Sequence, residues 1–244
     1  MMRMKFGIMG LDKMLNGGLV DGKVYMLVGE HGSGKTLLSL RFLLEGLNNG
    51  ESCLYIAVDK PPALVLQGAM LGFGWNLSSL RVMDAVPSEA LYSTTPSIRD
   101  ITAKGEITMA QHSKKKNEEK GELSIEGLTL KLLDQMKSVR FNRIVLDSLS
   151  LFKRFGIDED KEFMGIHRLI NFFKQTGATT IITSTQNVNL KAEYLLSAGV
   201  IEIEKRRGSA GYERYIRIVK MRGSDYDRKT KRMYITEDGI FVLR

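Results

Sequence analysis

A glycine-rich run with the spacing GxxxxGK[ST] is the feature of this sequence best suited to chemistry. It reads Gly29-Glu30-His31-Gly32-Ser33-Gly34-Lys35-Thr36 and lies between a predicted strand and a predicted helix. Glycines let such a loop wrap around phosphates, with backbone N–H groups and the helix N-terminus facing their negative charge. Lys35 would reach the β- and γ-phosphates, and Thr36 would offer its hydroxyl to Mg²⁺. The pattern therefore predicts a nucleoside triphosphate site formed by Gly29 to Leu37.

Two acidic residues follow predicted strands and could complete this site. Asp147 ends the apolar run Arg143 to Leu146, where a carboxylate can hold Mg²⁺ through its water shell. Asp59 follows the strand Ser52 to Val58, and it would lie beside the phosphate loop if that strand neighbours the loop's own strand. Hydrolysis needs a group that orients and deprotonates water, so Asp59 is the candidate base. A helix cap before Pro61-Pro62 explains the same residue nearly as well.

Positive charge is concentrated near the C-terminus. The formal net charge is +8, and between Lys205 and Arg232 eleven Lys or Arg stand against three Asp or Glu, so the rest of the chain is neutral. Such a patch is expected to meet phosphates, but the count does not identify their source. Within it, alternation along a strand puts Lys220 and Arg222 on one side, where they could neutralise charge developing on a γ-phosphate. On composition alone, a solvated strand face is the simpler explanation.

The elements that must position these residues alternate as in an α/β protein with a mostly parallel central sheet. The predicted strands of this core are Val24 to Val28, Ser52 to Val58, Arg143 to Leu146 and Thr179 to Thr183. The predicted helices are Thr36 to Leu47, Pro61 to about Leu71, Ile125 to Val139 and Phe163 to Gln175. From Gly199 the pattern changes to short alternating strands, including Tyr215 to Val219 and Met233 to Ile235, which fits antiparallel strands added to the parallel core.

The length of 244 residues fits one large globular domain or two small ones. Hydrophobic residues make up 43% and charged residues 26%, which excludes a largely disordered chain. No apolar run of about 18 residues marks a membrane span and no secretory signal is evident, so a cytoplasmic location without a membrane partner is expected. The single cysteine, Cys53, excludes an internal disulfide. Residues Tyr92 to Gly121 are predicted to form a mobile solvated loop, or alternatively a loop that orders on a nucleic acid or protein partner.

The chain resembles the RecA-type ATPases, and among them the single-domain relatives of the circadian clock protein KaiC. The phosphate loop is shared by many families, whereas Lys220-Met221-Arg222-Gly223-Ser224 is much more specific. The resemblance covers nearly the whole chain and is also carried by Phe6-Gly7-Ile8-Met9-Gly10-Leu11-Asp12, Gly17-Gly18-Leu19, Gly72-Phe73-Gly74-Trp75, Asp147-Ser148-Leu149 and Ile235-Thr236-Glu237-Asp238-Gly239-Ile240.

This resemblance implies that residues 1–244 form a single RecA-like domain that binds ATP and Mg²⁺. It also implies assembly into a ring, usually a hexamer, with ATP at each subunit interface. Lys220 and Arg222 would reach the neighbour's γ-phosphate, and Ser224 would approach its nucleotide. Two departures from the family pattern matter. Asp59-Lys60 stands where the family carries two glutamates, which implies slow hydrolysis or action through a second water, and Tyr226 stands where a histidine is frequent.

The sequence thus predicts an ATP-binding, slowly hydrolysing ATPase with a regulatory role. In this account Lys35 and Thr36 hold phosphate and metal, Asp147 positions the metal, and a polar group in Thr183-Ser184-Thr185-Gln186 senses the γ-phosphate. Two alternatives stay open. One is a recombinase-like DNA-binding accessory protein, favoured by the basic C-terminal segment, whose DNA affinity would fall steeply with salt. The other is a nucleotide-dependent switch that signals to a protein partner with negligible turnover.

Overall fold

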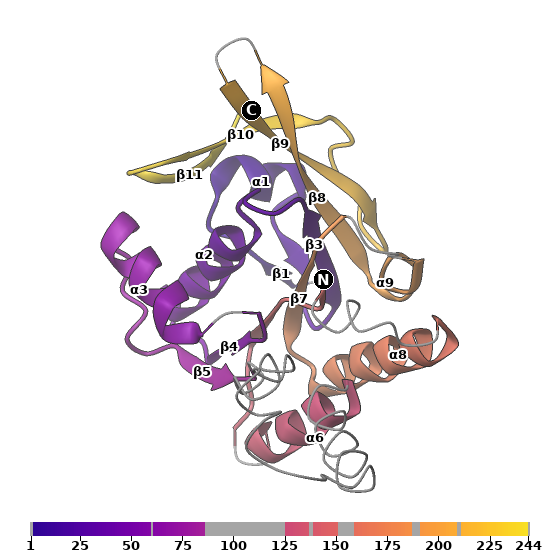
Figure 1. Ribbon diagram of the computed structural model, residues 1–244. Coiled ribbons are helices and arrows are strands. Elements are labelled where there is room, and N and C mark those ends of the chain that lie inside the picture. The colour runs from indigo at the N-terminus through magenta and orange to yellow at the C-terminus, as the bar shows by residue number, and fades with distance from the viewer. Residues whose placement is uncertain are drawn as a thin grey trace, which may run out of the picture.

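The protein is built on a nine-stranded sheet, seen here in a computed structural model that describes residues 2–59, 61–85, 125–136, 139–150, 159–186, 191–208 and 211–243. The strands are β3 (Val24–Gly29), β4 (Cys53–Ala57), β5 (Arg81–Asp84), β6 (Arg143–Asp147), β7 (Thr179–Ser184), β8 (Gly199–Gly208), β9 (Gly211–Met221), β10 (Lys231–Thr236) and β11 (Gly239–Val242). Their order is β11-β10-β9-β8-β3-β7-β6-β4-β5 (Figure 1). Six neighbouring strands are parallel to one another: β8, β3, β7, β6, β4 and β5. Strands β9, β10 and β11 are added beside β8 in antiparallel pairing. The predicted fold class is confirmed.

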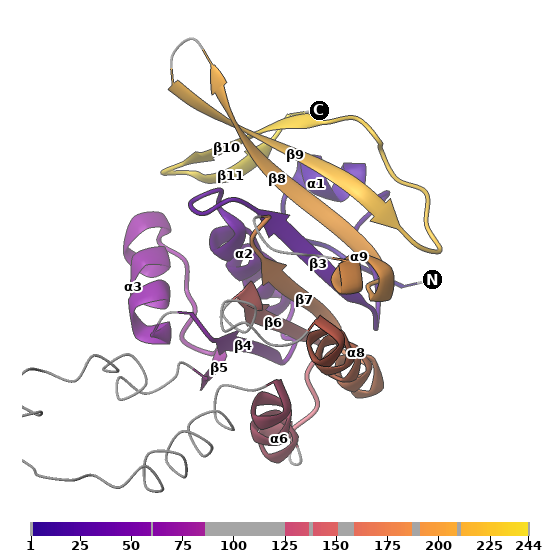
Figure 2. The same cartoon turned by 45° about the vertical axis from the view of Figure 1, so that its right-hand side comes forward.

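Helices cover both faces of this sheet (Figures 1 and 2). They are α1 (Met9–Met14), α2 (Lys35–Asn48), α3 (Pro62–Phe73), α6 (Ile125–Met136), α8 (Glu159–Thr176) and α9 (Lys191–Leu196), and β1 (Arg3–Met4) pairs with β2 (Leu19–Val20) in a small separate sheet. The sequence of strand β3 is continuously apolar because both faces of the strand are buried. Tyr25 and Leu27 pack into the core on the side of α2, and Met26 and Val28 pack into the core on the side of α6 and α8. Among the described residues, no helix is both long and apolar enough to cross a membrane.

Most predicted elements are confirmed, with differences at their ends. Helix α6 is described over Ile125–Met136 and Val139 is not helical, whereas α8, described over Glu159–Thr176, already includes residues before Phe163. Strands β8 and β9 are not short: they span 10 and 11 residues and pair with each other along nearly their whole length. Their hairpin extends past the rest of the sheet (Figure 2), so its outer part is held by cross-strand pairing rather than by a core. The predicted loop Tyr92 to Gly121 lies outside the described residues.

A buried arginine joins the N-terminal segment, α2 and the sheet. Arg143, at the start of β6, binds Glu51 through Nε at 2.6 Å and donates to the carbonyls of Lys5 and Phe42 at 2.6 and 2.9 Å. Its guanidinium also lies 4.5 Å from the centre of the Phe42 ring. Because a guanidinium removed from water needs such partners, this residue is a structural centre of the fold.

Candidate nucleotide-binding site

The glycine-rich loop connects β3 to the N-terminus of α2, as the sequence predicts. Gly34 has φ +106° and precedes the helix, whose first N–H groups have no side-chain cap. A Cβ at Gly29 would lie 2.5 Å from the carbonyl oxygen of Ile203, so the close approach of β8 excludes any larger residue there. Uncapped N–H groups at the start of a 14-residue helix attract anions, which is what a phosphate site requires.

Lys35 follows the loop and turns its side chain back over it. Its Nζ donates to the carbonyls of Gly29 and Glu30, at 2.8 and 2.9 Å. The ammonium group therefore lies at the mouth of the loop, within the same cavity as Gly32 and Gly34. This is the position from which a lysine can meet the β- and γ-phosphates of a nucleotide.

Asp147 accepts hydrogen bonds from three hydroxyl groups carried by different elements. Thr36 Oγ1 and Tyr55 OH donate to its Oδ2 at 2.7 and 2.9 Å, and Thr183 Oγ1 donates to its Oδ1 at 2.5 Å. Burial, followed by the nearby charge of Asp147, raises the pKa of Tyr55, so the phenol stays protonated and remains a donor. The sequence predicts Thr36 and Asp147 here, and it points to Thr183 only as one of four candidates. The role of Tyr55 depends on strand pairing that the sequence does not contain.

The oxygen atoms of Thr36 and Asp147 fit a magnesium ion carried by a nucleotide. They lie 2.7 Å apart, and both are the hard oxygen donors that Mg²⁺ prefers. In the parts of the chain that the structure describes, no three His, Cys, Asp or Glu residues gather into a metal site. A few protein oxygens are sufficient for Mg²⁺ when substrate phosphates supply further ligands.

Asp59 also lies in this cavity, although the sequence predicts this only if the strand before Asp59 is next to the strand of the phosphate loop. Strand β4 is not the neighbour of β3, because β7 and β6 stand between them. Asp59 nevertheless reaches the site because β4 pairs with β6 so that Ala57 lies opposite Asp147. Ser148 Oγ donates to Asp59 Oδ2 at 2.5 Å, and both residues line the cavity. Lys60 lies outside the described residues.

The cavity has a volume of about 320 Å³ and is lined by acidic, basic and apolar residues. Leu37 and Ile235 are its aliphatic lining residues, and the Ile235 side chain packs against Gly34. The remaining lining residues are His31, Gly32, Lys35, Thr36, Tyr55, Asp59, Asp147, Ser148, Thr185 and Arg214. Glu30, Ser33 and Gly29 belong to the same loop but are not among the lining residues.

Two cations of the β8–β9 hairpin hold the outside of the phosphate loop. Lys205 and Arg214 are register partners on β8 and β9. Lys205 Nζ donates to the His31 carbonyl at 2.8 Å, and Arg214 donates to the Gly32 carbonyl at 3.4 Å. Within the described parts of the chain, the Nε of Arg214 is buried without a hydrogen-bond partner. The sequence places both cations in the basic segment, but only the hairpin geometry brings them to the loop.

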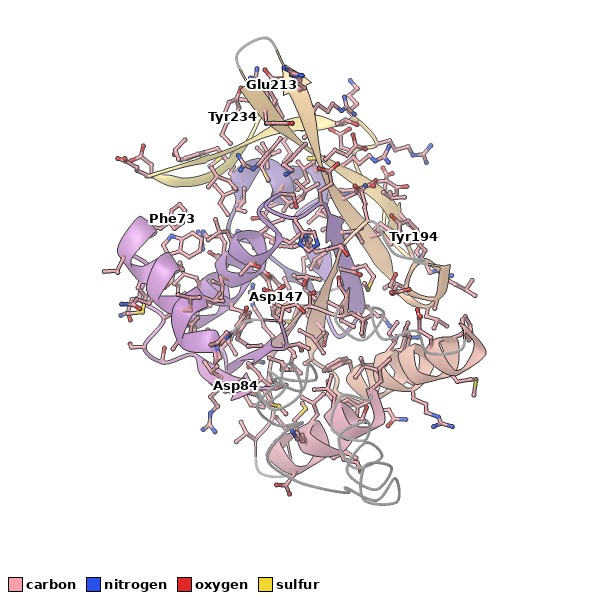
Figure 3. The ribbon with its side chains drawn as sticks, viewed as in Figure 1. Phe73, Asp84, Asp147, Tyr194, Glu213 and Tyr234 are labelled. Carbon is pink, nitrogen blue, oxygen red and sulfur yellow. The ribbon has the colours of Figure 1, made fainter. Side chains whose placement is uncertain are left out.

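Lys220 and Arg222 lie at the end of β9 that is farther from this loop. Lys220 pairs with Val200 on β8, and Val200 pairs with Met26 on β3. Because Met26 precedes Gly29 by three residues, and each residue of a strand adds about 3.3 Å, Lys220 lies about 10 Å from Gly29 along the strand direction. Both side chains point to the end of α9: Lys220 donates to the Tyr194 carbonyl, and Arg222 donates to the Leu195 carbonyl at 2.9 Å. Figure 3 shows Tyr194 well apart from Asp147.

Charge and burial around Lys220 weaken its hold on a proton. Burial, and then the positive charges of Arg222 and Lys174, lower the pKa of Lys220 from 10.5 to about 8. Ser224 and Tyr226 follow. Ser224 Oγ donates to the Asp225 carbonyl, and Tyr226, which packs partly buried against the core, donates weakly from its OH to the Val219 carbonyl. Within this copy, none of these residues lines the cavity.

The cations of the basic C-terminal segment therefore contact different parts of the molecule. Lys205 and Arg214 meet the phosphate loop, while Lys220 and Arg222 meet α9. Others form ion pairs on the hairpin and its neighbours: Arg206 with Glu204, Arg217 with Glu202 and Glu204, Arg232 with Glu213, and Lys231 with Asp227. Much of the charge that the sequence concentrates here is thus engaged within the fold.

Comparisons with known proteins agree with this geometry. A family model described as "ATPase: KaiC" matches residues 4–244. The chain is 27% identical to the circadian clock protein KaiC2 of Synechocystis, covering 97% of this chain and 39% of that relative. It is 28% identical to a UPF0273 protein of Pyrococcus horikoshii, covering 98% and 93%. The crystal structure of a KaiC-like protein from the same archaeon matches with a TM-score of 0.76 at 20% identity, covering 100% and 99%.

These matches define how far the likeness extends. The chain spans about two fifths of the length of the circadian clock relatives, at 39%, 42% and 43%. The structural match confirms the RecA-like fold with its added antiparallel strands. The family match supports ATP binding and ATPase activity. The chain belongs to the KaiC family of ATPases.

Proposed function

We propose that this protein is a Mg²⁺-dependent ATPase whose active sites form between copies of the chain in a ring, with slow turnover that serves a regulatory role. The observation that carries the proposal is the position of Lys220 and Arg222. Both lie at the end of β9 that is farther from their own phosphate loop, and both donate to backbone carbonyls of α9. A second copy could present these cations to the loop, and cations aimed at a γ-phosphate are what ATP hydrolysis uses.

In the proposed reaction, the chain's residues bind the triphosphate, orient a water molecule and neutralise the charge that develops on the γ-phosphate. The N–H groups of the phosphate loop and Lys35 bind the phosphates, and Thr36 and Asp147 hold the metal. Mg²⁺, when bound, withdraws charge from the phosphate oxygens. Asp59 accepts the proton of the attacking water, and the neighbour's Lys220 and Arg222 balance the charge on the transferred group. The products are ADP and inorganic phosphate.

Slow turnover is supported by the surroundings of Asp59. Its carboxylate already accepts a 2.5 Å hydrogen bond from Ser148 Oγ, so an attacking water must compete for it. The carboxylate must exchange this hydrogen bond for one to water before each turnover, which slows hydrolysis. Slow hydrolysis is what a regulatory ATPase needs, because the bound nucleotide then persists long enough to signal its state. Phosphate release measured for Ser148→Ala tests this point, because removing the hydroxyl should raise the rate.

The experiment that tests the proposed function compares Lys220→Ala with Arg206→Ala. Arg206 is a matched control because it is a cation of the same hairpin whose charge is engaged by Glu204. Lys220→Ala should reduce phosphate release by roughly 10³-fold or more, because a cation that stabilises the charge of the transition state contributes about 10³- to 10⁵-fold. Binding of a fluorescent ATP analogue should change much less, and Arg206→Ala should turn over like the wild type. Unchanged turnover in Lys220→Ala contradicts the proposal.

The engaged charges favour an ATPase over a DNA-binding accessory protein. Arg206, Arg217 and Arg232 are all paired with glutamates, which reduces the charge available to neutralise DNA phosphates. Tight DNA binding that weakens steeply with salt would favour the accessory protein. ATP binding without phosphate release at any protein concentration would favour the signalling switch.

A further inference from the structure

Hydroxyl groups from three separate elements fill most of the hydrogen-bonding capacity of the Asp147 carboxylate. Thr36 in α2 and Tyr55 in β4 both donate to Oδ2, at 2.7 and 2.9 Å, and Thr183 in β7 donates to Oδ1 at 2.5 Å. A carboxylate offers about four lone-pair sites, two on each oxygen. Within the part of the chain that the structure describes, both sites of Oδ2 are therefore filled, and one site of Oδ1 stays open.

The sheet fixes the position of the Tyr55 hydroxyl. Strands β4, β6 and β7 are neighbours (Figure 2), and Ala57 on β4 lies opposite Asp147 on β6. Tyr55 precedes Ala57 by two residues, so the two side chains lie on the same face of the sheet. Tyr55 is 1% exposed and packs into the core with α2, while its hydroxyl reaches Asp147 at the cavity wall. A phenol whose ring is held in a packed core is a rigid hydrogen-bond donor.

This arrangement restricts how Asp147 can meet a metal ion. Thr36 can donate its proton to Asp147 and still offer an oxygen lone pair to the metal. The carboxylate oxygen beside Thr36 is Oδ2, and a direct bond from Oδ2 to the metal would displace the hydrogen bond of Thr36 or of Tyr55. The open site on Oδ1 remains available to a water molecule of the metal. The three donors therefore favour contact through water over a direct bond.

Divalent cations differ in how well they accept such contact. Mg²⁺ is small and keeps several of its waters, whereas Ca²⁺ takes about six to eight oxygen ligands and readily binds carboxylates directly. A carboxylate that is limited to contact through water suits Mg²⁺ and leaves Ca²⁺ with one ligand fewer.

We propose that Tyr55 is a positioning residue whose hydroxyl prevents Asp147 from binding the metal directly, so that the site selects Mg²⁺ over Ca²⁺. The inference rests on the proposed Mg²⁺-dependent function and deepens it, because it assigns the choice of cation to a side chain outside the phosphate loop. Tyr55 acts through Asp147 and needs no contact of its own with the nucleotide or the metal.

A purely structural role for Tyr55 has a different consequence. A hydroxyl that only joins β4 to β6 would, when removed, change the stability of the fold and the binding of both cations to the same extent. The preference for one cation over the other would stay as it is. The ratio of two affinities therefore separates a positioning role from a structural one.

The test measures the Kd of a fluorescent, non-hydrolysable ATP analogue in saturating Mg²⁺ and in saturating Ca²⁺, for the wild type and for Tyr55→Phe. The substitution opens one site on Oδ2, so binding with Ca²⁺ should improve relative to binding with Mg²⁺. The ratio of the two Kd values should shift by about tenfold, within the range that the hydrogen-bond partners of metal-binding groups produce. Circular dichroism checks the fold, and Tyr55→Met, which also lacks the hydroxyl, replaces Tyr55→Phe if that variant unfolds.

Tyr25→Phe is the matched control. Tyr25 is another strand tyrosine that is 1% exposed and donates one hydrogen bond of 2.9 Å. Its acceptor is the Val20 carbonyl, and Tyr25 is not among the residues that line the cavity. The control should therefore keep the ratio of the wild type.

A second measurement follows the waters of the metal directly. Carboxylate and water ligands also suit Mn²⁺, and the relaxation of water protons reports how many water molecules this ion retains in its complex with the chain and the analogue. Tyr55→Phe should retain fewer waters on Mn²⁺ than the wild type, because Asp147 takes a place among the ligands.

The inference is overturned if Tyr55→Phe keeps the Kd ratio of the wild type, whether or not both affinities fall, or if Tyr25→Phe shifts the ratio equally. It is also overturned if the wild type shows no preference for Mg²⁺, or if Mn²⁺ retains as many waters in Tyr55→Phe as in the wild type. Failure of the proposed function is distinguishable. The wild type would then gain no affinity for the analogue from Mg²⁺ relative to EDTA, or would release no phosphate from ATP while its cation preference persists.

Discussion

Ring assembly should weaken as the pH rises through about 8, because Lys220 loses its proton there. Burial, aided by the positive charges of Arg222 and Lys174, lowers the pKa of Lys220 from 10.5 to about 8. Below this pH the free chain carries an ammonium group that can bind a neighbour's phosphate. Above it, the neutral amine must take up a proton as it docks, so assembly becomes less favourable with rising pH.

The size of the effect follows from the titration. With a pKa of about 8, about nine tenths of the Lys220 side chains are protonated at pH 7, and about one tenth at pH 9. Assembly that requires the protonated form should therefore weaken by about tenfold for each pH unit above 8, and change little below pH 7. A lysine with its ordinary pKa of 10.5 would give no change over this range.

The assay is light scattering of the chain with saturating Mg-ATP between pH 6.5 and 9.5, repeated with Lys220→Arg. A guanidinium keeps its charge throughout this range, so the variant should lose the pH dependence even if it assembles less well. A wild type that assembles equally at pH 7 and pH 9 refutes the reasoning. So does an identical fall in Lys220→Arg, which would assign the titration to another group.

Three further predictions concern the site and the fold. Asp147→Asn should weaken Mg²⁺ binding by about 10- to 100-fold while ATP binding in EDTA changes little, and equal Mg-ATP affinity in titration calorimetry would speak against its metal role. Asp59→Asn should slow phosphate release by about 10²- to 10⁴-fold without changing the nucleotide Kd, whereas full activity would leave only the helix-cap role. Arg143→Ala should lower the free energy of unfolding in urea by about 3 to 5 kcal/mol, because it removes at once the partner of Glu51 and the donor to the Lys5 and Phe42 carbonyls. The more exposed pair of Arg41 makes Arg41→Ala the control, with a loss under about 1 kcal/mol, and equal losses would contradict the buried role of Arg143.

The sequence predicts well those features whose parts are close together along the chain. The phosphate loop, its strand and its helix are consecutive, so the motif and the elements on either side support one another. The strand that ends at Asp147 is an uninterrupted apolar run because helices cover both of its faces. The short elements α1, α9, β1, β2 and β5 have too few residues for periodicity to mark them.

Features that depend on strand order and register are not contained in the sequence. Tyr55 and Thr183 meet Asp147 only because β4 and β7 flank β6. The sequence allows β4 beside the loop's own strand, whereas the sheet separates them by two strands. The direction of the β8–β9 hairpin likewise decides that Arg214 meets the loop while Lys220 lies at the far end. Neighbouring cations of one basic segment thus come to serve different parts of the molecule.

Phosphate release by mixtures of Lys35→Ala and Lys220→Ala tests most directly whether the active site is shared between copies. Each variant alone should be inactive, since one lacks the phosphate-binding lysine and the other lacks the cation given to its neighbour. In mixed rings, about a quarter of the interfaces join an intact phosphate loop to an intact Lys220, so an equal mixture should recover up to about a quarter of the wild-type rate. If native mass spectrometry shows mixed rings and they release no phosphate at any ratio, the shared site is contradicted.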